Sequence, residues 1–248
     1  MLYDLVAFDL DDTLAPSKGS LPTEVAEALR DLLQRVPVCV ISGGNFDQFR
    51  SQLLAGLEAP DVLLTDLHLM PTCGTRYMRY ESGQWVEKYA HNLTDEQKSR
   101  AIHSLRTHAE KLGLNEKRTW GPVIEDRLSQ ITFSALGQQA PIEAKRAWDP
   151  TGDKKHALAK AVAVDVPDLE VRSGGSTSVD ITARGVDKAY GMSKLVEVTR
   201  IAKERMLFVG DRLDPSGNDY PVRAAGWPTI EVAGWEETPA VIAQIIAE

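Results

Sequence analysis

The feature that most constrains this chain is a short apolar run followed at once by aspartates. Residues 5–8 are Leu-Val-Ala-Phe, a pattern typical of a central parallel strand buried on both faces. Asp9, Asp11 and Asp12 come directly after it. Side chains two residues apart on an extended backbone point the same way, so Asp9 and Asp11 are expected to face one site. The carboxyl end of a strand is where open α/β sheets bind ligands.

Two neighbouring carboxylates cannot both stay ionised at low cost without a cation. An aspartate pair of this kind is also compatible with a simple turn, in which Asp12 and Thr13 bond the local backbone. Later parts of the chain favour a functional site. They are a hydroxyl after a second strand, a lysine at a helix start, and two acidic positions after a late strand: Ser42, Lys188, Gly210-Asp211 and Asn218-Asp219.

The order of these motifs resembles the haloacid dehalogenase superfamily of aspartate-dependent phosphotransferases. The resemblance implies that Asp9 is the nucleophile and forms an aspartyl-phosphate. It implies that Asp11 protonates the leaving oxygen and later activates water or an acceptor hydroxyl. Ser42 would hydrogen-bond a phosphoryl oxygen, with backbone N–H groups of the turn at Gly43 beside it, and Lys188 would neutralise charge near the nucleophile.

The same resemblance implies a Mg²⁺ site. Asp9, the backbone carbonyl of Asp11, and Asp211 would hold the ion, because hard oxygen ligands suit it. Asp219, with Asn218, would orient the metal shell. Taken alone, Lys188 is better explained as a solvated lysine in a first helical turn, and Asp219 as a helix cap.

Strand and helix patterns alternate at the start of the chain and again from residue 187. Such alternation predicts an α/β fold, a doubly wound, Rossmann-like parallel sheet. The first half is expected to contain helices over residues 23–35 and 46–57 and strands over residues 37–41 and 61–65. Between the two halves, a hairpin, a helix capped by Thr94 and Gln97, and alternating strands predict antiparallel sheet. We therefore expect a catalytic core of residues 1–81 and 187–248 and an inserted α+β cap, the substrate-specificity domain, of residues 82–186.

The cap carries a more specific resemblance, to the eukaryotic-type phosphomannomutases and related sugar-phosphate phosphatases of the superfamily (the HAD-IIB-like branch). The motifs are Ile124-Glu125-Asp126-Arg127, residues 130–134, Gly174-Gly175-x-x-Ser178-Val179-Asp180, Asp187-Lys188 and Pro215-x-Gly217-Asn218-Asp219. The resemblance implies that Arg127 binds the distal phosphate of the substrate and that Ser178 and Asp180 bind sugar hydroxyls. Without it, Arg127 would be a surface arginine, and Ser178 and Asp180 outward residues of an alternating strand.

Two departures from those mutases favour hydrolysis over intramolecular transfer. Gln138 stands where the mutases carry a further cap arginine, and the next cations are Lys145 and Arg146. Fewer arginines would weaken the hold on a bisphosphorylated intermediate. Ser42 is the hydroxyl usual in phosphatases of the superfamily, where the mutases carry glycine.

The leading expectation is therefore a Mg²⁺-dependent phosphatase, a phosphoric monoester hydrolase acting on a small phosphate ester such as a sugar phosphate. The alternative is a phosphomannomutase-like hexose-phosphate mutase. A third possibility, a phospho-accepting receiver domain, would use Asp66 at the end of a middle strand. The receiver fold needs no cap and about half this length, and the D-x-D-x-T motif argues against it.

Composition limits the partners. The net charge is −8 and the pI is about 5.2, so binding to nucleic acid or to an anionic membrane is not expected. No apolar run approaches membrane length, and no leader is apparent. Cys39 and Cys73 have no metal-ligand spacing and are expected to be buried thiols in a reducing cytoplasm. The resemblance leaves a monomer or a cap-mediated homodimer.

Overall fold

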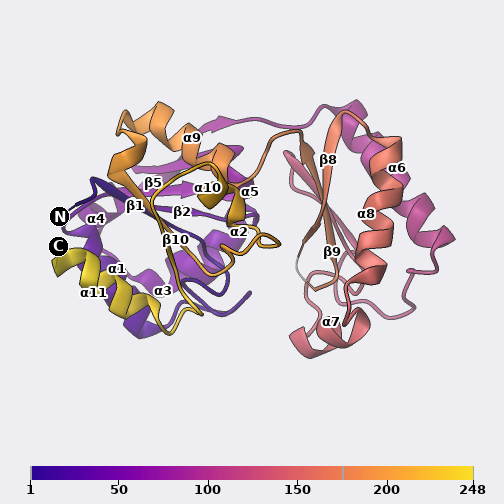
Figure 1. The fold of residues 1–248 in the computed structure, drawn as a ribbon, viewed down its shortest axis with the longest axis horizontal. Helices are drawn as coiled ribbons and strands as arrows, with labels where there is room; N and C mark the ends of the chain where they lie inside the picture. Colours follow the sequence, from indigo (N-terminus) through magenta and orange to yellow (C-terminus); the bar gives the residue numbers. More distant parts are fainter. Residues whose placement is uncertain (1, 175, 248) are drawn as a thin grey trace. The chain divides into compact units, whose positions relative to one another are not determined.

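The computed structural model describes residues 2–174 and 176–247, which divide into two compact units (Figure 1). The core unit contains the described residues up to Ala90 and those from Val186 onward. The cap unit contains residues 91–185. The chain enters and leaves the cap unit once, so the cap is an insertion within the core sequence.

The core unit is built on a seven-stranded sheet with the order β11-β10-β1-β2-β3-β4-β5. Neighbouring strands from β11 to β3 are parallel, whereas β4 and β5 form an antiparallel extension. The strands are β1 (Leu5–Phe8), β2 (Val38–Ile41), β3 (Leu67–Met70), β4 (Arg76–Glu81), β5 (Gln84–Ala90), β10 (Met206–Gly210) and β11 (Thr229–Glu231).

Alternate residues of β1 enter two different apolar clusters, so the sheet is covered on both faces. Val6 and Phe8 pack with residues of α1 (Thr23–Leu33) and α11 (Thr238–Ala247). Leu5 and Ala7 pack with residues of α9 (Lys188–Thr199) and α10 (Tyr220–Ala224). Figure 1 shows these helix pairs on opposite sides of the core sheet. The predicted doubly wound α/β fold is confirmed.

The first boundary of the cap differs from the one predicted. Residues 82–90 belong to the core unit because β5 pairs with β4 along its whole length, from Gln84 opposite Glu81 to Ala90 opposite Arg76. The hairpin therefore extends the core sheet, and the insertion begins at His91. The sequence signal for antiparallel pairing was correct, but it did not show which sheet the hairpin joins.

Two further predictions about the first half need correction. Residues 61–65 are not a strand: Asp61–Leu64 forms helix α4, which begins after Pro60 with Asp61 in its first turn, where the helix dipole favours a carboxylate. The strand is β3, where His68 interrupts the apolar pattern. The predicted helix over residues 46–57 is broken into α2 (Phe46–Phe49), a π-helical segment η1 (Arg50–Leu54) and α3 (Ala55–Leu57).

The cap unit is a four-stranded antiparallel sheet with the order β6-β7-β9-β8. Its strands are β6 (Ile124–Asp126), β7 (Gln130–Ser134), β8 (Leu169–Gly174) and β9 (Ser178–Ala183). Helices α6 (Asp95–Lys111) and α8 (Asp153–Asp165) pack on the face that carries Ile131, Phe133, Val179 and Ile181 (Figure 1). The sequence pattern did not reveal α7 (Ile142–Trp148). Of the predicted Gly174-Gly175 turn, Gly175 lies outside the described residues.

Other local predictions can be compared directly. Thr94 and Gln97 form the expected capping box at the start of α6. Cys39 is buried, but Cys73 is half-buried, and the two do not form a disulfide. No helix in residues 2–174 or 176–247 is both long and apolar enough to cross a membrane. The remaining short elements are α5 (Pro71–Gly74) and η2 (Lys203–Arg205).

Buried His68 on β3 gives the fold a testable pH dependence. Its side chain is 7% exposed, and its Nδ1 lies 2.7 Å from the Tyr77 hydroxyl. Burial, together with the charge of Arg79, lowers the pKa of His68 from 6.5 to about 3. The neutral ring stabilises the fold fully above pH 6.5, and that stability is lost as the pH falls toward 3, since the unfolded chain binds the proton more tightly.

We expect the unfolding free energy of the wild type to fall, relative to that of His68→Gln, by about 1.4 kcal/mol per pH unit below pH 6.5. Glutamine can still accept a hydrogen bond from Tyr77 but does not titrate. Urea denaturation of both proteins at pH 7, 6 and 5 measures the difference. A constant difference over this range would contradict a neutral buried histidine.

Candidate active site

Three buried charged side chains meet at the carboxyl end of the core sheet. Lys188 Nζ lies 2.7 Å from Asp9 Oδ1 and 2.5 Å from Asp219 Oδ1. Asp9 directly follows β1, and Asp219 precedes α10. Lys188 is the first residue of α9, whose N-cap Asp187 accepts a hydrogen bond from the Tyr190 N–H. The cap residue thus fixes where the helix starts and where the lysine side chain begins.

Burial and mutual charge determine the protonation of this cluster. Burial raises the pKa of Asp9 well above its ordinary value, and the neighbouring Asp219 and Asp11 add to the rise, against the opposing effect of Lys188. For Lys188, burial alone would lower the pKa, but the carboxylates of Asp219 and Asp9 more than reverse that effect and raise it. The lysine therefore stays charged between carboxyl groups that compete for it.

The two oxygens of Asp9 differ in their surroundings. Oδ1 faces Lys188, whereas Oδ2 has no hydrogen bond or ion pair to any atom of residues 2–174 and 176–247. Both oxygens of Asp219 are engaged, Oδ1 by Lys188 and Oδ2 by the backbone N–H of Arg212 at 3.1 Å. Asp219 therefore fixes Lys188, and Asp9 offers one oxygen for chemistry.

A cation fits beside these residues. Asp9, Asp211 and Asp219 can each present a carboxylate oxygen so that all three atoms lie within 4.8 Å of one another. Thr13 Oγ1 donates to Asp211 Oδ1 at 3.1 Å and orients that carboxylate. Burial and the charge of Asp219 raise the pKa of Asp211. Three crowded carboxyl groups are an oxygen donor set that suits Mg²⁺.

The carboxylate of Asp11 is not part of this oxygen cluster. Asp11 Oδ1 accepts hydrogen bonds from the Lys18 N–H at 2.9 Å and from Gln52 Nε2 at 3.1 Å, and Oδ2 accepts one from Gln48 Nε2 at 3.0 Å. Burial would raise the pKa of Asp11, but the charge of Lys18 and these hydrogen bonds outweigh it and lower the pKa. Asp9 and Asp11 lie beyond the end of β1, and their carboxylates have separate partners.

Ser42 and Gly43 follow β2, the parallel neighbour of β1, as predicted from the sequence. Ser42 is 3% exposed, and its Oγ accepts a hydrogen bond from the backbone N–H of Gly44 at 3.1 Å. That N–H is therefore not open to an anion while this bond persists. Asn218 is exposed, although the adjacent Asp219 is fully buried.

In the cap unit, the predicted binding residues lie on the polar face of the sheet. Ser178 and Asp180 alternate with the buried Val179 and Ile181 of β9. Asp180 Oδ1 accepts hydrogen bonds from Gln130 Nε2 at 2.9 Å and Thr132 Oγ1 at 2.7 Å. This carboxylate is therefore held in place by two side chains of β7.

Arg127 follows β6 and makes two hydrogen bonds to Glu125 Oε2, at 2.9 and 2.7 Å. Gln138 Nε2 is buried and has no hydrogen-bond partner within the described ranges 2–174 and 176–247. Lys145 Nζ donates to the carbonyl of Gln138 at 2.8 Å. A cation therefore lies beside the position where an arginine is absent.

A left-handed turn supports the helix that carries Lys188. Thr72, Cys73 and Gly74 of α5 all have positive φ, and α5 packs against α9. A Cβ on Gly74 would lie 2.5 Å from the Cα of Gly191, so the two backbones can approach this closely because both residues are glycine.

We expect Gly74→Ala to lower the unfolding free energy by about 2–4 kcal/mol, from left-handed strain plus a backbone clash. Gly83 also has positive φ, but nothing lies within 4 Å of a Cβ placed there. Gly83→Ala is therefore the matched control, with an expected loss of about 1 kcal/mol. Chemical denaturation of both variants tests this, and equal losses would contradict the close approach of α5 and α9.

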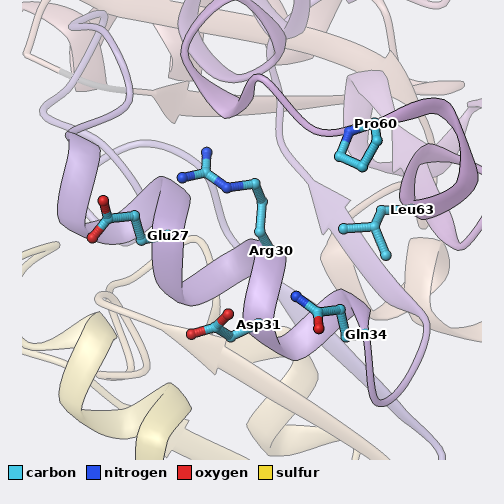
Figure 2. Close-up of a pocket in the computed structure, with 6 residues that line it drawn as sticks. All are labelled: Glu27, Arg30, Asp31, Gln34, Pro60 and Leu63. Carbon is cyan, nitrogen blue, oxygen red and sulfur yellow. The ribbon is translucent and has the colours of Figure 1, made fainter.

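Two hollows elsewhere contain none of the predicted site residues. One, of about 390 Å³, lies on the core unit and is lined by α1 and by Pro60 and Leu63 (Figure 2). In this hollow, Arg30 is held by a 2.7 Å hydrogen bond to the carbonyl of Leu57. The other, of about 510 Å³, lies in the cap unit beside Ile124 and Phe133. The candidate site is therefore identified by its chemistry and not by cavity size.

Comparison with known proteins identifies the family of this chain. A family model, Eukaryotic phosphomannomutase, matches residues 25–246, which include parts of both units. The chain belongs to the eukaryotic phosphomannomutase family. It is therefore a phosphotransferase of the haloacid dehalogenase superfamily, and enzymes of this superfamily generally use Mg²⁺.

Members of the phosphomannomutase family in distant organisms are about equally similar to this chain. Phosphomannomutase 1 of Homo sapiens is 26% identical over 227 residues, covering 89% of this chain and 83% of that protein. Phosphomannomutase of Saccharomyces cerevisiae is 25% identical over 224 residues, covering 88% of this chain and 84% of that protein. The similarity is distributed along nearly the whole chain.

Solved structures with little sequence identity share the fold. IMP-bound Plasmodium falciparum IMP-nucleotidase, truncated at its N-terminus, has a TM-score of 0.71 at 16% identity, covering 99% of this chain and 68% of that chain. A haloacid dehalogenase-like hydrolase from Bacteroides thetaiotaomicron has a TM-score of 0.67 at 16% identity, covering 98% and 99%. These likenesses show the fold alone.

Sequence reasoning missed the polar side chains around Asp11. Gln48 and Gln52 come from α2 and η1, four residues apart, and both contact the Asp11 carboxylate. The usable signal was the pair of glutamines at helical spacing directly after the Ser42 turn, since such residues share one helix face. In this phosphomannomutase-family chain, the pair adds to the motifs quoted above.

Proposed function

We propose that this chain is a phosphomannomutase-type hexose-phosphate mutase, which moves a phosphoryl group by way of an aspartyl-phosphate on Asp9. The observation that carries the proposal is the family match over residues 25–246, since it runs through the cap unit as well as the core positions Ser42, Lys188 and Asp211. Arg127, Ser178 and Asp180 all lie within that match. A phosphorylated sugar is accordingly the proposed substrate.

In the proposed reaction, Asp9 Oδ2 attacks phosphorus and the bond from phosphorus to the sugar oxygen breaks. Asp11 gives its proton to that leaving oxygen. In the second half, a sugar hydroxyl attacks the phosphorus of the aspartyl-phosphate, Asp11 takes the hydroxyl proton, and Asp9 regains its carboxylate. Lys188 keeps Asp9 Oδ1 in place, so the attacking oxygen keeps its direction.

Mg²⁺ bound by Asp9 and Asp211 would neutralise charge on the phosphoryl oxygens during transfer. Asp219 would remain bonded to Lys188 and to the Arg212 N–H and so orient the ligands from behind. In the cap unit, we assign Arg127 to the distal phosphate and Ser178 and Asp180 to sugar hydroxyls. The proximity of Lys145 to Gln138 supports a mutase, because a cation is present near the position of the absent arginine.

A phosphatase is the second candidate, and two observations favour it. Ser42 offers a hydroxyl to the site where the mutases carry glycine, and Gln138 contributes no charge. In a phosphatase, water would take the place of the sugar hydroxyl in the second half of the reaction. The two candidates share every step up to the aspartyl-phosphate, so the acceptor alone distinguishes them.

The test measures both products from the same tubes. The protein is incubated with mannose 1-phosphate and Mg²⁺, with and without glucose 1,6-bisphosphate, and hexose 6-phosphate and inorganic phosphate are both quantified. We expect hexose 6-phosphate to form, with a requirement for the bisphosphate and little released phosphate. Released phosphate without isomerisation would overturn the mutase in favour of the phosphatase.

Two variants make the assay specific to the site. Asp9→Asn should abolish both products. Asp12→Asn is the matched control, because Asp12 lies in the same motif but is exposed, and its carboxylate bonds only the Ser17 N–H among the described residues. Its φ of +61° suits asparagine as well as aspartate. Equal loss in the two variants would contradict the assignment of Asp9 as nucleophile.

A further inference from the structure

Two glutamine side chains form a closed hydrogen-bonded ring with Asp11. Gln52 Nε2 donates to Asp11 Oδ1 at 3.1 Å, and Gln48 Nε2 donates to Asp11 Oδ2 at 3.0 Å. Gln48 Nε2 also donates to Gln52 Oε1 at 2.8 Å, which joins the two amides. Each carboxylate oxygen of Asp11 therefore has its own amide donor, and the plane of the carboxylate is fixed.

Both N–H donors of each amide are used, and each amide oxygen accepts one hydrogen bond. A glutamine amide has two N–H donors. Gln48 directs its donors to Asp11 and Gln52, and its Oε1 accepts from Lys18 Nζ at 2.6 Å. Gln52 directs its donors to Asp11 and to the carbonyl of Pro16 at 3.3 Å. Turning either amide over would place an oxygen against the carboxylate, so one orientation is strongly preferred.

Local backbone features place the amides of Gln48 and Gln52 against the Asp11 carboxylate. Asn45 Oδ1 accepts from the Gln48 N–H at 3.0 Å and starts α2, and the π-helical segment η1 follows at Arg50. Gly44 makes room for Gln48, because a Cβ there would lie 2.2 Å from Gln48 Oε1. Gln52 is 3% exposed. A buried glutamine with every polar atom hydrogen-bonded is held rigidly in one orientation.

The oxygens of Asp11 are left with different capacities. Each carboxylate oxygen can accept about two hydrogen bonds. Oδ1 accepts from the Lys18 N–H and from Gln52, so it is saturated. Oδ2 accepts from Gln48, and Lys18 Nζ lies farther away at 3.6 Å. The ring therefore leaves room at Oδ2 for a proton in transit.

We propose that Gln48 and Gln52 are positioning residues that orient the Asp11 carboxyl group and assign Oδ2 as the atom that exchanges the proton with the substrate oxygen. The inference rests on the proposed function in so far as Asp11 is taken as the acid and base of an Asp9-centred transfer. It adds two residues whose effect on catalysis acts through Asp11. Neither glutamine needs to touch the substrate.

The test uses aryl phosphates whose leaving phenols differ in acidity. A good leaving group such as 4-nitrophenolate needs little protonation, whereas phenolate needs more. The slope of log kcat/KM against leaving-group pKa therefore measures how far the rate depends on proton donation by Asp11. The variants are Gln48→Met and Gln52→Met, since methionine keeps side-chain length and helix propensity. Gln34→Met, on the exposed end of α1, is the matched control.

We expect Gln48→Met and Gln52→Met to lower kcat/KM for phenyl phosphate about 10-fold or more, as partial loss of a general acid would. For 4-nitrophenyl phosphate we expect a loss below about threefold, because that leaving group needs little acid assistance. The slope should therefore approach that of Asp11→Asn. Adding Gln52→Met to Asp11→Asn should cause no further loss, because the residue acts through Asp11.

An equal loss of kcat/KM for all aryl phosphates would overturn the proposal, since a merely structural role lowers kcat/KM for every substrate alike. An additive loss in the Asp11→Asn background would overturn it as well. So would a wild-type slope as steep as that of Asp11→Asn, or no aryl phosphate turnover by the wild type. These substrates contain no sugar, so the two proposals can fail separately. If the mutase assay forms no hexose 6-phosphate but the glutamine variants still change the slope, only the proposed function is rejected.

Discussion

Replacing Asp9 by asparagine is expected to lower phosphoryl transfer by about 10⁴-fold or more, because it removes the attacking oxygen of a covalent mechanism. The same change is expected to leave the metal-free protein at least as stable as the wild type. Burial, reinforced by Asp219 and Asp11, raises the pKa of Asp9, so the ionised carboxylate is disfavoured in the folded state. An amide removes that cost, and Lys188 keeps its contact with Asp219.

The sign of the pH dependence follows from the raised pKa. The contribution of Asp9 to stability is fully present below the unfolded pKa of 3.8 and is lost as the pH rises through the higher folded pKa. The metal-free wild type should therefore lose stability relative to Asp9→Asn between pH 4 and pH 7. Urea denaturation in a chelating buffer at these pH values measures the difference.

Adding Mg²⁺ should reverse the order of the two proteins. A ligand that binds the folded state stabilises it by mass action, so the melting temperature of the wild type should rise with Mg²⁺ concentration. Asp9→Asn lacks one of the proposed ligands and should respond much less. Asp12→Asn should respond like the wild type. Equal stabilisation of all three proteins would contradict a metal site at Asp9.

The core fold could be predicted well because short local sequence patterns indicate its strands and helices. Residues 5–8, 38–41 and 206–210 are short apolar runs, each followed by a polar residue that the site uses. Such runs predict buried parallel strands whose ends meet at one edge of the sheet. That topology brings Asp9 and Asp211 together, and Lys188 and Asp219 reach Asp9 from the starts of α9 and α10.

What the sequence did not reveal depends on tertiary contacts. Residues 61–64 have a strand-like composition but form a helix, and the π-helical segment after α2 interrupts an apparently regular helix. The direction of the Asp11 carboxylate could not be inferred from a two-residue spacing, because β1 ends at Phe8 and Asp12 has positive φ. That turn lets Asp11 meet Gln48 and Gln52 instead of the Asp9 cluster.

The preference for hydrolysis came from giving weight to two positions, Ser42 and Gln138. The family match runs from residue 25 to residue 246 and favours the mutase alternative. In the folded cap unit, Lys145 lies against the Gln138 carbonyl, so a missing arginine in the sequence does not mean a region without a cation. Position-by-position comparison cannot show such replacement by a neighbouring residue, because the two positions are seven residues apart.

Replacing Lys188 by methionine is expected to have the largest effect on stability. The lysine side chain is 2% exposed and contacts Asp9 and Asp219, which are 3% and 0% exposed. Methionine fills a similar volume but leaves these carboxylates uncompensated. Breaking a buried ion pair by removing one partner costs about 3–5 kcal/mol, so we expect an unfolding free energy lower by that amount at pH 7 without Mg²⁺.

The expected loss comes from unpaired charge, and this predicts which second substitution restores stability. Asp219→Asn added to Lys188→Met should recover part of the lost free energy, since it removes one of the two buried, uncompensated charges, although it lowers stability in the wild-type background. Lys194→Met is the control on the same helix: Lys194 pairs with the exposed Glu197 at 2.8 Å, and its loss should cost less than about 1 kcal/mol. Denaturation of the wild type, the two single variants at Lys188 and Asp219 and their double variant completes the cycle. A Lys188→Met protein as stable as Lys194→Met, or a double variant weaker than both single variants, would show that Lys188 does not compensate the two carboxylates.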